Sequence, residues 1–124
     1  MADPDLLAAS PTMCEPRAVG EEWDAVRVPR DVGRLALDIL GPRSGAVIED
    51  GTAFYWLLPV GSTDGWDLAT TRALPAGTTL AVPLARRTVG PGPHWRICPG
   101  DDRLLTPADV LRAAVGDALG RGEQ

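Results

Sequence analysis

The chain of 124 residues contains no lysine and no asparagine, and it has one histidine and two cysteines. With a single histidine there is no His–His pair to hold a metal ion. Cys14 and Cys98 lie far apart in the sequence and form no CxxC pair, which predicts reduced thiols. The chain also lacks an apolar run of transmembrane length and a signal peptide, so we expect a cytoplasmic protein with no membrane partner.

Positive charge is scarce as well, because 12 arginines stand against 17 acidic residues and the net charge is −5. Such a chain has no basic face of the kind that coats nucleic acid, although one local basic site remains compatible with it. Three common motifs are missing too: the Walker A loop, GxGxxG and the GxSxG nucleophile elbow. The sequence therefore assigns no catalytic residue and no cofactor.

What the sequence does contain predicts one α+β domain over residues 21–120. Residues 1–20 hold three prolines and no sustained period, which is typical of a flexible arm, and residues 121–124 are expected to fray. A chain of this length buries roughly two-thirds of its unfolded surface, so a hydrophobic core is expected.

Periodic apolar residues predict two helices and a run of short strands. Asp31 is a good N-cap for the first helix, and Gly41 with Pro42 ends it. The expected helices span 31–40 and 107–119, and the expected strands span 23–28, 45–49, 53–60, 69–73, 79–82 and 94–97. This order predicts a mainly antiparallel or mixed sheet with both helices packed against it.

The strand at 53–60 is apolar on both faces, so it should be central and covered, or open on one face to a partner. Asp50 and Gly51 before it predict a tight type I′ hairpin turn in which Asp50 adopts a positive φ. Glu49 and Asp50 are also weak candidates for Mg²⁺ ligands. Because neighbours on a strand point to opposite faces, we favour a solvated turn over a metal site.

The densest positive charge lies in the stretch from Thr79 to Ile97, TLAVPLARRTVGPGPHWRI. It predicts a hairpin in which the strand 79–82 leads through the basic loop 84–88 and a Gly-Pro turn to the strand 94–97. The basic side chains of this hairpin are Arg86, Arg87, His94 and Arg96. The planar guanidinium group suits phosphate, so the hairpin is a candidate nucleotide- or anion-binding site. The alternative is a solvated turn whose charges are balanced by nearby acids.

Two segments carry a family resemblance. AVPLARRTVGPGPHW, with Pro83, Gly90 and Trp95, resembles the end of the bifunctional DNA primase–polymerase N-terminal domain, of the archaeo-eukaryotic primase superfamily. GPRSGAVIEDG resembles the same family's glycine-rich approach to a strand that ends in Asp-x-Asp. The resemblance covers roughly residues 41–97, and small actinobacterial proteins with openings like WDAVRVPRDVGRLALDIL are more similar still. It implies the primase–polymerase fold and a nucleotide-binding history.

The same comparison predicts that polymerase activity is absent. Ile48 stands where the family has its first metal carboxylate, and FYWLL lacks the expected histidine. Ala85 and Arg87 replace the family's Ser-x-His step. Two-metal nucleotidyl transfer needs several carboxylates that converge on Mg²⁺, and this chain does not keep them.

Three functions follow from these observations. The first is an inactive primase–polymerase-like domain that binds a nucleotide, a nucleic-acid end or another anion through the four basic residues, with Arg87 as the anchor. The second is a protein-interaction module that uses the N-terminal arm or the strand 53–60. The third, an active nucleotidyltransferase with Glu49 and Asp50 as metal ligands, has the fewest residues in its support.

Overall fold

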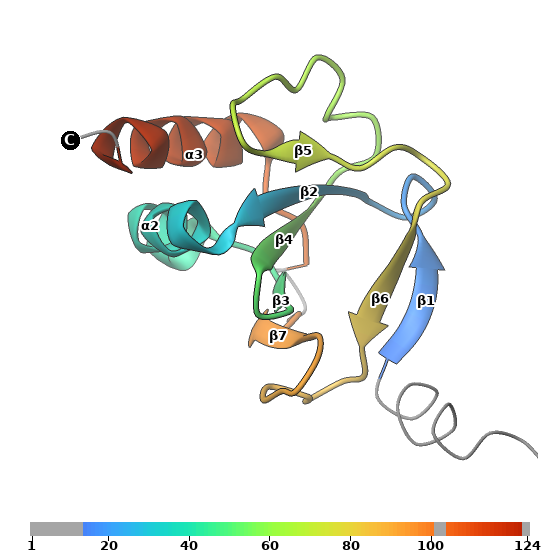
Figure 1. Cartoon of the computed structure of the whole chain (residues 1–124). Helices are drawn as coiled ribbons and strands as arrows, with labels where there is room; N and C mark the ends of the chain where they lie inside the picture. Colours follow the sequence, from blue (N-terminus) through green and yellow to red (C-terminus); the bar gives the residue numbers. More distant parts are fainter. Residues whose placement is uncertain (1–13, 101–103, 123–124) are drawn as a thin grey trace, which may run out of the picture.

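The computed structural model describes residues 14–100 and 104–122. Within these ranges the chain forms two antiparallel sheets, two α-helices and a short 3₁₀ turn (Figure 1). In chain order the elements are β1 (Cys14–Ala18), β2 (Asp24–Pro29), α2 (Arg30–Leu40), η1 (Gly41–Arg43), β3 (Val47–Glu49), β4 (Ala53–Leu58), β5 (Arg72–Ala73), β6 (Thr79–Pro83), β7 (His94–Ile97) and α3 (Ala108–Gly122). The predicted α+β class, with two helices packed on an antiparallel sheet, is confirmed.

The larger sheet has five strands in the order β5-β2-β4-β3-β7, with β4 in its centre. The smaller sheet is the ribbon of β1 and β6. Figure 1 shows the helix pair on one side of the larger sheet and the ribbon on the other. Both faces of the larger sheet are therefore covered, as the apolar strand 53–60 predicts.

Side chains alternate across β4 and so build two cores, one on each face of the sheet. Phe54, Trp56 and Leu58 face the helices and pack with Val26, Leu40 and Leu111, among others. Leu57 faces the ribbon and packs with Ile48, Leu80 and Trp95. Trp66 packs at the edge of the helix-side core, where its Nε1 donates to Thr71 Oγ1 at 2.8 Å.

Helix α2 carries an apolar face that packs on the sheet and on α3. Pro29, not Asp31, is its N-cap residue; Asp31 lies in the first turn, where its charge favours the positive end of the helix dipole. Gly41 ends the helix with φ 53°, as predicted. Within the described residues, no helix is long and apolar enough to span a bilayer.

The expected flexible arm is wrong over its last part. Cys14–Ala18 form β1, which pairs with β6 along five residues, and Val19 is buried in the ribbon-side core. Pairing with β6 supplies the backbone hydrogen bonds that this proline-containing segment lacks by itself. Residues 1–13 lie outside the described ranges. At the other end, α3 runs to Gly122. The prediction that residues 121–124 fray is therefore wrong for residues 121 and 122.

The expected hairpin of residues 79–82 and 94–97 is also wrong. β6 pairs with β1, and β7 pairs with β3 at the edge of the other sheet. The intervening residues 84–93 are a crossing between two sheets and not a tight turn. This segment, which we call the crossing loop, carries the candidate anion-binding arginines.

The turn before β4 differs from its prediction. Glu49 pairs with Phe54, and Asp50 N donates to Ala53 O at 3.3 Å, so the turn is centred on Gly51 and Thr52. Gly51 has φ 96°, whereas Asp50 and Thr52 keep negative φ, so the turn is not type I′.

The packing of α2 on β4 generates a stability prediction. A Cβ added to Gly33 would lie 3.0 Å from two ring carbons of Phe54, whereas one added to Gly116 in α3 would meet nothing within 4 Å. Gly116→Ala should raise the free energy of unfolding by about 0.5–1 kcal/mol through helix propensity. Gly33→Ala should lower it, because overpacking costs about 1–3 kcal/mol. Urea denaturation of both variants measures this; equal gains would contradict a tight contact between α2 and β4.

Candidate functional site

The crossing loop is held by its own hydrogen bonds. Arg87 Nε donates to Pro93 O at 3.1 Å, and its Nη2 donates to Pro91 O. The Arg87 amide donates to Leu84 O at 3.1 Å, and the Arg87 carbonyl accepts from Trp95 N at 2.8 Å. Trp95 is buried and its Nε1 also donates to Leu84 O, at 3.2 Å. The guanidinium of Arg87 thus holds the loop through its Nε and Nη2.

His94 belongs to a second group of charges, centred on Glu49. Its Nε2 lies 3.6 Å from Glu49 Oε1, and its Nδ1 lies 2.9 Å from Gly92 O. Arg30 Nε lies 3.4 Å from the other Glu49 oxygen. Both ring nitrogens of His94 face acceptors, so its contact with Glu49 becomes an ion pair when the imidazole is protonated. Only 8 % of Glu49 is exposed, and the Arg30 guanidinium offsets part of the cost of burying its carboxylate.

Arg86 and Arg96 are the two exposed members of the predicted basic set. Arg86 has φ 70°, a left-handed conformation at the turn of the crossing loop. Arg96 is the extra residue of a β-bulge, because Val47 pairs with Ile97 and Ile48 pairs with Trp95. Neither arginine forms an ion pair with a residue in the described ranges. The four predicted residues therefore divide into two that hold the structure and two that face solvent.

Asp50 is bound into its own turn. Its Oδ1 accepts from the Thr52 amide, the Thr52 hydroxyl and the Ala53 amide at 2.9–3.0 Å, and its Oδ2 accepts from Tyr55 Oη at 3.0 Å. Burial acts to raise the pKa of Asp50, but these hydrogen bonds outweigh it and leave the pKa lowered. Burial, together with the charge of Asp50, raises the pKa of the Tyr55 phenol, while Arg27 opposes that rise.

Glu49 and Asp50 turn to different faces of the sheet and do not converge. Glu49 meets Arg30 and His94 on the helix side, whereas Asp50 and Tyr55 line a cavity of about 200 Å³ beside β6. Across residues 14–100 and 104–122, no three His, Cys, Asp or Glu side chains are grouped to hold a metal ion.

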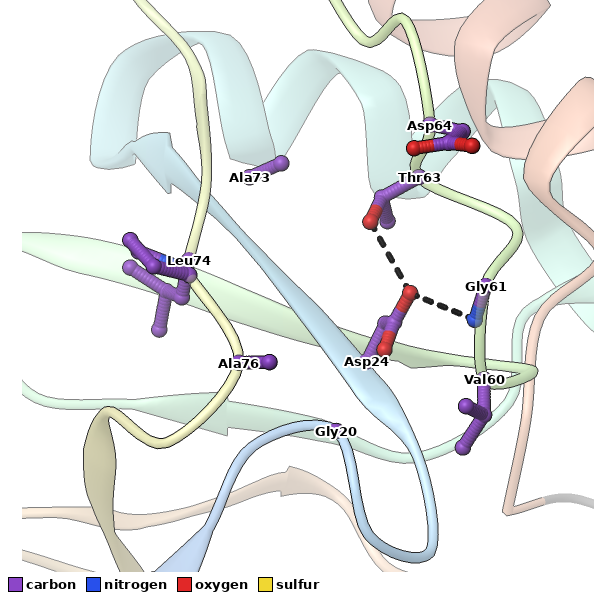
Figure 2. Close-up of a pocket in the computed structure, with 10 residues that line it drawn as sticks. Gly20, Asp24, Val60, Gly61, Thr63, Asp64, Ala73, Leu74 and Ala76 are labelled. Carbon is purple, nitrogen blue, oxygen red and sulfur yellow. Dashed lines mark hydrogen bonds between the residues drawn. The ribbon is translucent and has the colours of Figure 1, made fainter.

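Two features of the structure have no local signal in the sequence. Arg30 was not singled out, because only the tertiary pairing of β2 and β3 with β4 brings it to Glu49. A cavity of about 370 Å³ lies between the loop 60–64 and the segment 73–76, with Asp24 of β2 in its wall (Figure 2). No local motif marks it, since its walls come from three separate parts of the chain.

A scan against protein-family models, a search of curated proteins and a search of solved structures each found no match to this chain. The resemblance to primase–polymerases stays a prediction.

The hydrogen bonds of Asp50 predict a pH-dependent stability. Its pKa is lower in the folded chain than in the unfolded chain, where it is near 3.9. The stabilisation is therefore complete above that value and declines as the pH falls through the folded pKa. Asp50→Ala should cost about 1–2 kcal/mol at pH 7 through the lost hydrogen bonds. The difference from wild type should shrink below about pH 4.

Urea denaturation of both proteins between pH 7 and pH 3 measures this difference. Asp38→Ala, at an exposed acid of α2 with no ion pair to a described residue, is the matched control. A difference between Asp50→Ala and wild type that stayed constant across this range would show that the carboxylate charge does not stabilise the turn.

Proposed function

We propose that this chain is a non-catalytic binding domain of the primase–polymerase type, which takes a phosphate-bearing ligand such as a nucleotide or a nucleic-acid end. The ligand binds at the crossing loop and the adjoining end of β7, through Arg86 and Arg96. One observation carries the proposal: in an acidic chain, the hydrogen-bonded crossing loop and the bulge of β7 that follows it each present an exposed arginine with no carboxylate partner among the described residues.

The fixed backbone of the loop supports this assignment. Arg87 and Trp95 hold the loop from within, so a ligand meets arginines that project from an ordered support. Less conformational entropy is then lost when the ligand binds. Arg87 changes from the predicted anchor to a positioning residue, and His94 faces the loop carbonyl of Gly92 and the carboxylate of Glu49.

The surroundings of the acidic residues favour binding over nucleotidyl transfer. Ile48, at the position of the family's first metal carboxylate, is buried in the ribbon-side core. Glu49 faces two basic side chains, and both oxygens of Asp50 accept hydrogen bonds from their own turn. The two carboxylates lie on different faces of the sheet and do not converge on one metal ion.

The second candidate is a protein-interaction module, and of its two predicted surfaces the part of the N-terminal arm in residues 1–13 lies outside the described ranges. Strand 53–60 does not serve, because β4 is covered on both faces and lies between β2 and β3. The crossing loop exposes two large apolar side chains instead: Leu84 is 42 % exposed and Val89 is 72 % exposed. The crossing loop is therefore a further surface on which a protein partner would dock.

Alanine substitutions of the exposed arginines test the binding proposal. Arg86→Ala and Arg96→Ala should each weaken a 5′-phosphorylated oligonucleotide by about three- to tenfold, since each removes one charge-assisted contact. The loss should be larger at low salt than at high salt. Fluorescence anisotropy at two salt concentrations measures it. Arg34→Ala, at an exposed position of α2, is the matched control.

Two outcomes would decide against phosphate binding at the loop. Equal affinity for all variants is one. The other is no measurable binding of the oligonucleotide by wild type, which would favour the protein-interaction candidate.

The proposal also predicts no metal-dependent nucleotide incorporation. Labelled nucleotide, a primed template, and Mg²⁺ or Mn²⁺ should give no extended product, because the carboxylates needed for two-metal chemistry do not converge. Asp50→Ala is the control for contaminating polymerase. Incorporation by wild type that disappears in Asp50→Ala would overturn the non-catalytic assignment.

A further inference from the structure

The larger cavity lies far from the crossing loop. β5 and β2, next to which it opens, form one side of the five-stranded sheet, whereas β7 forms the opposite edge. Figure 2 shows the Asp24 carboxylate between the loop 60–64 and the segment 73–76. A volume of about 370 Å³ is at the small end of the range for ligand pockets.

Asp24 is a buried residue whose carboxylate is hydrogen-bonded on one oxygen only. The residue is only 8 % exposed, and its Oδ2 accepts from Gly61 N and Thr63 Oγ1, each at 2.9 Å. Its Oδ1 has no donor among the described residues, yet every fully buried side-chain nitrogen or oxygen there has a partner. Oδ1 is therefore accessible, and the space beside it is the cavity.

The charge around the cavity is negative and unbalanced. Asp64 adds a second carboxylate to the lining, and no described cation forms an ion pair with either acid. A carboxylate that is more than nine-tenths buried is normally paired or fully hydrogen-bonded, because its desolvation is costly. Asp24 is satisfied on one oxygen only, so the remaining oxygen suits a cationic donor.

The other residues that line the cavity are apolar or glycine, apart from the Thr63 donor. Val60 closes one side, and Leu74 with Pro75 closes the other. Such walls fit a short hydrocarbon stem and leave the charged end at Asp24. A divalent metal ion fits less well, because two carboxylates are present and no third ligand of the His, Cys, Asp or Glu type is grouped with them in the described part of the chain.

We propose that this cavity binds an alkylammonium or alkylguanidinium group, with the cation on Asp24 Oδ1 and the stem between Val60 and Leu74. The group can belong to a free amine or to a lysine or arginine side chain of a peptide. This site is independent of phosphate binding at the crossing loop, so each proposal can fail without the other.

Titration of the isotope-labelled full chain, followed by ¹H–¹⁵N correlation spectra, tests the site. n-Butylammonium chloride should shift the amides of Gly61, Thr63 and Leu74 and leave those of the crossing loop in place. Butan-1-ol, which keeps the stem and lacks the charge, should bind at least about tenfold more weakly. Acetyl-Gly-Arg-Gly-amide should shift the same amides more strongly than its citrulline analogue if the cation can belong to a peptide side chain. If only n-butylammonium shifts them, the source is a free amine.

Two variants locate the cation. Asp24→Asn keeps an acceptor for Gly61 and Thr63 but removes the charge, so n-butylammonium should bind at least about tenfold more weakly. Asp64→Asn, at an exposed residue, should weaken binding about twofold at low salt and less at high salt. Asp38→Asn on α2 removes the same charge away from the cavity and should change nothing. If thermal melting shows that Asp24→Asn is unfolded, Asp64→Asn and the butan-1-ol comparison decide.

Other results would overturn the proposal. Equal binding of butan-1-ol and n-butylammonium would show that the carboxylate is not recognised. Shifts caused by MgCl₂ alone would assign the pocket to a metal ion. No shift at the cavity amides with either the amine or the arginine peptide would show that it binds no such cation.

Discussion

Burial of β4 on both faces is the constraint on which the rest of this structure depends. Its alternate side chains reach into two different cores, so the strand is stable only when helices cover one face and further strands cover the other. Helices α2 and α3 meet the first need, and the β1–β6 ribbon meets the second (Figure 1). Loss of either layer would expose a continuous row of large apolar side chains, which is unfavourable in water.

This constraint explains which parts of the fold the sequence could predict. The helix period in α2 and α3 and the apolar run in β4 are local, and each was placed within a few residues. The partner of β6 was not predictable in the same way. Residues 84–93 contain enough glycine and proline to suggest a hairpin turn, but turn chemistry says nothing of which strand lies alongside. β1 takes that place, and its sequence CEPRA has neither alternation nor β-branched residues to announce a strand.

The crossing loop shows why a cluster of basic residues in a sequence does not by itself predict how many of them are free to bind a ligand. Pro91 and Pro93 have no amide hydrogen, so the turn around Gly92 has few internal donors for its carbonyls. Side chains supply them: Arg87 donates to the carbonyls of Pro91 and Pro93, and His94 Nδ1 meets that of Gly92. The same glycine- and proline-rich composition that predicts a turn therefore also uses two of the four predicted cations. A loop with several carbonyls that lack amide donors needs side-chain donors. Some of its basic residues are therefore expected to bond the loop itself, and only the rest are free to bind a ligand.

Glu49, Asp50 and Asp24 differ in how many of their carboxylate oxygens have a hydrogen-bond or ion-pair partner. Both oxygens of Glu49 face basic side chains, and both oxygens of Asp50 accept hydrogen bonds from residues within the same turn or strand. Asp24 is as buried as Glu49, but its Oδ1 has no donor among the described residues and lies beside the cavity. The ligand proposed for this cavity would supply the donor that the protein does not. By this measure the acid that no sequence motif marks has the strongest claim to a ligand, because motifs count residue types and the claim depends on the donors that a residue lacks.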